Sequence, residues 1–125
     1  MRTYKFRGKS LLLDFQGTTF VYGSLVMENK IPFIKEFNKA IGVVDYHQVI
    51  KETVGQFTGL QDKNGKDIYE GDILRNESGD TIKCVFEIKD SHSAFSLIDE
   101  KNPRRMYFSI HISFKIIGNI HEVEE

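Results

Sequence analysis

The sequence predicts a mainly β protein, namely a small SH3-like β-barrel with long loops. One short helix is compatible with the pattern. Residues Thr81–Ile88 alternate apolar and polar side chains, as a half-buried strand does. Turn-forming clusters at Asn76–Asp80 and Asp99–Pro103 separate short apolar runs. A Gly-Asp start at Gly71, followed by a strand, a turn at Ser78-Gly79 and a second strand, is typical of SH3-like barrels. This analogy concerns the fold and carries no function.

Five runs predict strands because they are short, apolar and bounded by glycine or polar clusters. They are Tyr4–Arg7, Phe20–Met27, Thr81–Ile88, Ala94–Ile98 and Ser109–Ile116. The alternation is most regular in the last run, where one face carries Ile110, Ile112, Phe114 and Ile116. In the first run Tyr4 and Phe6 face inward and Lys5 and Arg7 face outward. In Thr81–Ile88 the inward residues are Ile82, Cys84, Phe86 and Ile88.

The segment Pro32–Ile41 fits two structures. Apolar residues recur at nearly helical spacing, Pro32 suits a first helical turn, and Gly42 suits a helix end. A strand is equally compatible, with Phe33 and Lys35 on one side and Ile34 and Glu36 on the other. Periodicity alone leaves helix and strand open here.

Length and charge predict one domain without a strong electrostatic field. The chain has 125 residues, so we expect a single domain over residues 1–125. Seventeen Lys and Arg oppose eighteen Asp and Glu, for a formal charge of −1. Any contact with nucleic acid or an anionic membrane must therefore come from a local patch.

The cysteine count and the N-terminus predict a cytoplasmic protein. Cys84 is the only cysteine, which excludes an intramolecular disulfide and a zinc site built from several thiolates. Only three consecutive leucines precede Asp14, far fewer than a signal peptide needs. No apolar run approaches the ~20 residues of a membrane-spanning helix. We therefore expect no membrane contact.

The segment Thr53–Leu74, TVGQFTGLQDKNGKDIYEGDIL, combines turn residues with apolar anchors. Its Asn64-Gly65 pair predicts a tight turn with positive φ at both residues. Leu60 and Ile68 would anchor this loop in the core on either side. The charged residues of the loop, Asp62, Lys63 and Lys66, would stay in water.

The carboxylates of this segment, Asp62, Asp67, Glu70 and Asp72, could in principle hold a divalent metal or act as acid and base. Their spacing does not match a calcium-binding loop. Aspartates at turns and strand starts commonly accept backbone N–H groups, so a structural role is favoured, above all for Asp72. No cofactor or metal is expected.

No catalytic motif appears in the sequence. The histidines His47, His92, His111 and His121 are too far apart for a local metal motif, so they could meet only through folding. Cys84 faces inward and His111 faces outward in their predicted strands, which disfavours a Cys-His nucleophile. There is no G-x-S-x-G sequence, phosphate loop or dinucleotide fingerprint. We therefore expect no enzyme.

Two basic groups are the most prominent local charges. The first consists of Arg2, Lys5, Arg7 and Lys9, and the second of Lys101, Arg104 and Arg105 beside Tyr107 and Phe108. If folding joined them, they would form a basic patch with aromatic residues, as in barrels that bind single-stranded nucleic acid. Alternatively, they are lysines and arginines that protect strand edges from pairing. The sequence does not show whether the groups share a face.

Four blocks are similar, in order and spacing, to recurring blocks of the YopX family of phage and prophage proteins. They are KFRGK at Lys5–Lys9, VYGSL at Val21–Leu25, the segment Thr53–Leu74 and IIGNIHE at Ile116–Glu122. The chain departs from the family at Phe20, where tryptophan is frequent, and in a longer stretch at Glu28–Gln48. The resemblance implies a mostly β, barrel-like fold and a phage or prophage origin. It implies no reaction and no catalytic residues.

The central block supplies the residues of the family motif, which we interpret as mainly structural. They are Thr53, Gly55, Gln56, Thr58, Gly59, Asp62, Gly65, Ile68, Tyr69, Glu70, Gly71 and Asp72. At its surface, Lys63, Lys66 and Glu70 remain to be tested for function.

The first functional hypothesis is a non-enzymatic accessory module that binds a protein partner or a second copy of itself. The alternative is a nucleic-acid-binding barrel that uses the basic patch, and a metal-dependent enzyme is the remote third hypothesis. The sequence identifies neither the partner nor the oligomeric state.

Overall fold

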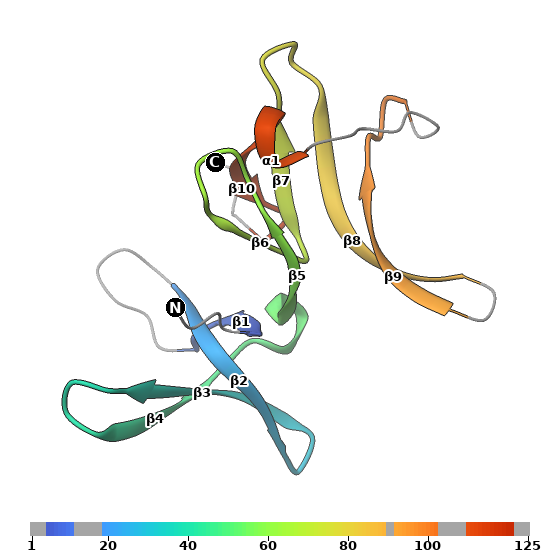
Figure 1. Cartoon of the computed structure of the whole chain (residues 1–125). Coiled ribbons are helices and arrows are strands. Elements are labelled where there is room, and N and C mark those ends of the chain that lie inside the picture. Colours follow the sequence, from blue (N-terminus) through green and yellow to red (C-terminus); the bar gives the residue numbers. More distant parts are fainter. Residues whose placement is uncertain (1–4, 12–18, 90–91, 103–109, 122–125) are drawn as a thin grey trace. The chain divides into compact units, whose positions relative to one another are not determined.

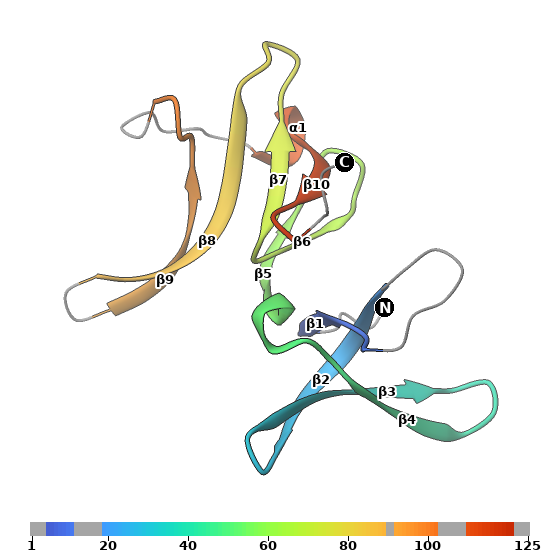
Figure 2. The same ribbon diagram turned by 180° about the vertical axis from the view of Figure 1, so that it is seen from behind.

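The computed structural model describes residues 5–11, 19–89, 92–102 and 110–121. By its internal contacts the chain divides into two compact units, Met1–Phe57 and Thr58–Glu125. Figures 1 and 2 show the same ribbon from opposite sides. The expectation of one domain over residues 1–125 stays a prediction, and each unit is described by itself.

The first unit is an antiparallel meander with the strand order β4-β3-β2-β1, followed by the start of β5 beside β1 (Figure 1). Its elements are β1 (Phe6–Lys9), β2 (Phe20–Glu28), β3 (Ile31–Asn38), β4 (Val43–Gln48), the short 3-10 helix η1 (Lys51–Thr53) and β5 (Gly55–Gln61). Strand β5 continues into the second unit, where it neighbours β6. The predicted strand Phe20–Met27 is therefore confirmed.

The ends of β1 and β4 are joined by backbone hydrogen bonds, which bends the meander back on itself. Leu11 N–H donates to the Gln48 carbonyl over 3.0 Å, and Ile50 N–H donates to the Lys9 carbonyl over 2.8 Å. Ile34 and Val49 are buried in this unit, with exposed fractions of 0% and 2%.

The close approach of β3 explains a glycine in β2. A Cβ atom on Gly23 would lie 2.1 Å from the carbonyl oxygen of Lys35 and 3.2 Å from Cγ2 of Ile34. No real Cβ atom tolerates the first distance, because the neighbour is backbone and cannot rotate away. Gly23 is thus required by the close approach of β3, which the letters VYGSL alone did not indicate.

The segment Pro32–Ile41 is a strand rather than a helix up to Asn38. Two residues, Asn29 and Lys30, connect β2 to β3, and both have positive φ, 49° and 69°. This is the pattern of the tight turns that twist in the same sense as a β-hairpin. The turn places Ile31–Lys35 beside β2, and β4 pairs with the rest of β3, so cross-strand hydrogen bonds replace those of a helix.

The second unit contains a four-stranded antiparallel sheet in the order β10-β7-β8-β9 (Figure 2). Its elements are β6 (Asp67–Tyr69), β7 (Asp72–Arg75), β8 (Thr81–Lys89), β9 (His92–Ile98), α1 (Ile110–Ser113) and β10 (Lys115–Asn119). The predicted strands Thr81–Ile88 and Ala94–Ile98 are confirmed. Its core consists of Ile68, Leu74, Ile82, Cys84, Ile110 and Phe114. Cys84 is buried, as the alternation predicted.

The predicted strand Ser109–Ile116 is wrong in its first half. Residues Ile110–Ser113 form a single helical turn, closed by Phe114 N–H donating to the Ile110 carbonyl over 3.0 Å, and the strand begins only at Lys115. Ile112, expected inside, has an exposed fraction of 65%. Alternation misled because Ile110 and Phe114 share a face in either structure, being two strand repeats or one helical turn apart.

The fold is therefore mainly β, as predicted, and its one short α-helix among the described residues is Ile110–Ser113 rather than the segment Pro32–Ile41. The two sheets do not close into a barrel among the described residues, so the SH3-like barrel is not confirmed. In the described ranges, no helix is long and apolar enough to cross a membrane.

Candidate functional site

The central family motif is organised around the carboxylate of Asp62, which is only 3% exposed. Its Oδ1 accepts N–H groups from Asn64 and Lys66, each over 2.9 Å, and its Oδ2 accepts the N–H of Ile116 over 2.9 Å. Burial raises the pKa of Asp62. The N–H groups of Ile116, Lys66 and Asn64 and the charge of Lys66 together lower it by more than burial raises it, so the net pKa lies below 3.8. The expectation that Asp62 stays in water is wrong.

The loop after Asp62 differs from the predicted turn in one respect. Within residues 62–66, all of which are described, only Gly65 has a positive φ, at 80°, and Asn64 does not. Gly65 N–H donates to the Asp62 carbonyl over 3.0 Å, and Asp62 N–H donates to the Lys66 carbonyl over 2.8 Å. This is a three-residue hairpin loop with glycine in the left-handed position.

The anchors of this loop are unequal. Ile68 is fully buried, as predicted, but Leu60 has an exposed fraction of 47% and does not anchor the loop. Gly59, with φ at 88°, lies between Thr58 and Leu60 and breaks the regular alternation of β5. The motif's surface lysines, Lys63 and Lys66, are exposed.

Other motif residues also serve the backbone. The hydroxyl of Thr53 accepts Lys9 N–H over 2.8 Å, and that of Thr58 donates to the Ile68 carbonyl over 2.8 Å. Asp72, 1% exposed, accepts Tyr69 N–H over 2.8 Å, which caps the bend before β7. Gly71 has φ at 96°, which favours glycine. Most polar groups of the motif are thus engaged in holding the chain.

The basic groups are only partly described. Arg2, Arg104, Arg105, Tyr107 and Phe108 lie outside the described residues, Lys5 and Lys101 are exposed, and Lys9 is half-buried.

Arg7, expected on the outer face, is 5% exposed. Its guanidinium carbon lies 4.3 Å from the ring centroid of Phe20, so its alternation with Phe6 was assigned to the wrong side. The basic patch stays a prediction.

An open pocket of about 660 Å³ lies in the second unit, between the β7–β8 turn and the residues that follow β9. Ile73, Ile82 and Ile98 line it with apolar surface. At its rim, Lys83 Nζ lies 2.5 Å from Glu100 Oε1. Its size suits a small ligand. Lys83 and Glu100 at the rim neutralise each other, and no nucleophile with an adjacent base is found among the described lining residues.

Strand β4 presents an exposed apolar edge. Ile41, Val43, Val44 and Tyr46 have exposed fractions of 67%, 43%, 39% and 57%. Among the described residues, β4 is the end of the sheet order and has β3 as its strand neighbour.

The hydrogen-bonding direction along β4 follows from one bond at its end. Val49 N–H donates to the Pro32 carbonyl over 3.2 Å, so Val49 directs its backbone toward β3. Because backbone groups alternate in direction along a strand, those of His47, Asp45 and Val43 also face β3. The N–H and C=O groups of Val44 and Tyr46 therefore point outward, away from β3.

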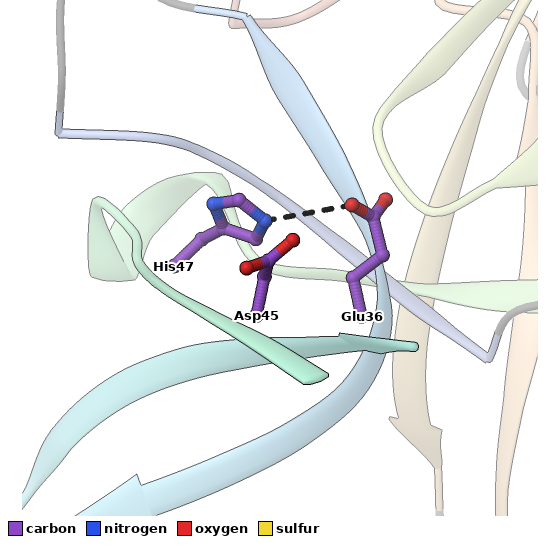
Figure 3. A group of neighbouring side chains, drawn as sticks. All are labelled: Glu36, Asp45 and His47. Carbon is purple, nitrogen blue, oxygen red and sulfur yellow. Dashed lines mark ion pairs between the residues drawn. The ribbon is translucent and has the colours of Figure 1, made fainter. Parts of the chain in front are cut away.

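A group of three side chains lies on the opposite face of the same hairpin (Figure 3). Glu36 of β3 lies directly across from Asp45 of β4, and His47 is two residues further along β4. One ligand atom from each residue lies within 4.8 Å of the other two. His47 Nε2 is 3.6 Å from Glu36 Oε1, is buried, and makes no hydrogen bond.

Sequence reasoning missed this group because Glu36, Asp45 and His47 form no motif along the chain. His47 was compared only with the other histidines. A hairpin assignment over residues 31–48 would have placed 36 opposite 45, but that assignment required the segment Pro32–Ile41 to be a strand.

Fold and surfaces together define a mainly β protein of two antiparallel sheets, whose described polar motif residues are largely structural. A family model described as YopX protein matches residues 15–125. The chain therefore belongs to the YopX family, as its sequence blocks indicated. No curated protein matches the sequence.

Proposed function

We propose that this YopX-family chain is a cytoplasmic, non-enzymatic accessory module of a phage or prophage, and that it acts through protein contacts. The observation that carries the proposal is the edge of β4, which combines outward backbone groups with exposed apolar side chains. Natural proteins commonly protect such edges, because an unpaired edge recruits another strand. The lone Cys84 suits a reducing compartment.

The occupant that we propose for this edge is β4 of a second copy, paired antiparallel about a two-fold axis. Among the described residues, the part of the edge without a strand partner is centred on Val44 and Tyr46, because the Gln48 carbonyl already accepts Leu11 N–H. Pairing Val44 with Val44 of the second copy uses this part and leaves Gln48 untouched.

This register also avoids a repulsive contact. It places Asp45 opposite Val43 of the second copy, whereas a shift of the register by one residue along each strand sets the two Asp45 carboxylates against each other. Like charges directly opposite destabilise a strand pair.

The experiment compares sedimentation of the wild-type chain with that of Val44→Pro. Val44 N–H points away from β3, so proline removes an edge donor without removing a bond to β3. Val44→Thr is the matched control, because it keeps the N–H and the branched side chain. We expect a concentration-dependent dimer for wild type and Val44→Thr and a monomer for Val44→Pro. A wild-type chain that stays monomeric at millimolar concentration contradicts the proposal.

A second candidate function is nucleic-acid binding, favoured by one observation on β1 and β2. Lys9 Nζ lies 5.7 Å from the ring centroid of Phe20, and the Phe20 and Tyr22 centroids are 6.4 Å apart. A cation beside aromatic rings is the pattern on which single strands stack. Titration with single-stranded DNA at two salt concentrations tests it, since phosphate contacts are strongest at low salt. Absence of binding at low salt excludes this candidate.

A further inference from the structure

We propose that Glu36, Asp45 and His47 form a binding site for a divalent transition-metal ion of the zinc type. The three side chains project from one face of the β3–β4 hairpin and converge on one point (Figure 3). Their face is opposite to that of Val44 and Tyr46, so the site does not depend on the proposed pairing of β4.

The register of the hairpin brings the donors together. Glu36 and Asp45 are cross-strand partners, and His47 lies diagonal to Glu36, opposite Ile34. Ile34 is fully buried, which fixes the backbone at that end of the site. Ligands on paired strands are held more precisely than ligands on loops, so small rotamer changes suffice to bring them to bonding distance.

The charges and the unbonded nitrogen at this site favour binding of a cation. Two carboxylates directly across a strand pair repel each other when both are ionised. The nearest nitrogen, His47 Nε2, is buried, makes no hydrogen bond, and points toward Glu36 Oε1 at 3.6 Å. A metal ion between them would accept the nitrogen lone pair and neutralise both carboxylates, which addresses both unfavourable features at once.

The donor set selects the class of metal. One imidazole nitrogen and two carboxylate oxygens suit zinc, cobalt, nickel or manganese, whereas magnesium and calcium prefer oxygen ligands alone. Asp45 is exposed, so water can complete the coordination shell. Three protein ligands with an open position resemble the arrangement of solvent-accessible zinc sites rather than closed structural ones.

Calorimetric titration of the metal-free chain with zinc chloride, and cobalt absorption spectra, test the site directly. We expect one zinc ion per chain and a cobalt spectrum with nitrogen coordination. Glu36→Gln and His47→Gln should each weaken zinc binding by at least about tenfold, because even losing a residue that only orients a ligand costs that much. Glu77→Gln and His111→Gln are the matched controls, and they should bind as wild type does.

Thermal unfolding supplies a second readout that does not rely on heat of binding. Zinc should raise the Tm of wild type, since a ligand of the folded state stabilises it. Glu36→Gln should abolish that rise. It should change the Tm of the metal-free chain little, because it removes both a repulsion with Asp45 and the contact with His47. Equal zinc binding by wild type and both Glu36→Gln and His47→Gln would overturn the proposal. So would an equal loss of binding in His111→Gln.

Discussion

Oδ2 of Asp62 accepts the backbone N–H of Ile116 over 2.9 Å, although the two residues are 54 positions apart in the chain. The bond ties the loop of the central family motif to the start of β10. The same carboxylate holds its own loop through Asn64 and Lys66. One buried aspartate therefore connects two of the four sequence blocks that resemble the YopX family.

Asp62→Ala should lower the free energy of unfolding by about 2–4 kcal/mol, because three backbone N–H groups lose a charged acceptor in a largely buried position. Urea denaturation monitored by circular dichroism measures the change. Asp67→Ala is the control, since the carboxylate of Asp67 accepts a hydrogen bond from the exposed side chain of Gln61 over 3.1 Å. It should cost less than about 1 kcal/mol. Equal losses of stability in Asp62→Ala and Asp67→Ala would contradict the structural role of the Asp62 carboxylate.

Stability should depend on pH through Asp62. Its folded pKa lies below the ordinary value of 3.8, so the ionised form is favoured in the folded state. The resulting stabilisation is fully present above pH 3.8 and is lost as pH falls through the folded pKa. We expect the stability difference between wild type and Asp62→Asn to shrink as the pH is lowered from about 6 to about 2. A difference that stays constant over this range contradicts the assignment.

Gly23→Ala should destabilise the first unit by about 2 kcal/mol or more, because its Cβ would lie 2.1 Å from the Lys35 carbonyl oxygen. Relief requires β2 and β3 to separate. Ser24→Ala, at the next and exposed position of β2, is the control and should change stability by less than about 0.5 kcal/mol. Denaturant unfolding of both variants decides whether the close approach exists.

The helical turn α1 predicts opposite results for two neighbouring apolar residues. Phe114, 1% exposed, should cost about 3–5 kcal/mol when replaced by alanine. Ile112→Ala should cost less than about 1 kcal/mol, because Ile112 is 65% exposed. In a continuous strand over Ser109–Ile116 both side chains would be inside. Similarly large losses of stability at both positions would therefore support the strand and contradict the helical turn.

Much of the second unit was predictable because its signals are local. The alternation in Thr81–Ile88 correctly placed Ile82 and Cys84 inside, since a strand with one buried face imposes period two on its own residues. The structural role of Asp72 was also predictable, because turn aspartates accept nearby N–H groups. Where two local structures share a period, as at Ile110 and Phe114, the pattern could not decide.

The candidate sites were not predictable in the same way. Val44 and Tyr46 become an edge only because β4 ends the sheet, and strand order is a property of the whole unit. Likewise, Glu36 meets Asp45 only through the register of β3 and β4. Neither relation leaves a local mark in the sequence.

By itself, the sequence determined the mainly β class, the family, and the turns that hold the central motif, because these depend on side chains that are close along the chain. Tertiary structure decided which residues are buried although their strand pattern predicted exposure, as with Arg7. It also decided which distant residues meet, as with Asp62 and Ile116. The physical reason is that strand register and sheet order are set by pairing between segments that are distant in the sequence. The energy of that pairing depends on both partners, so neither segment alone reveals it.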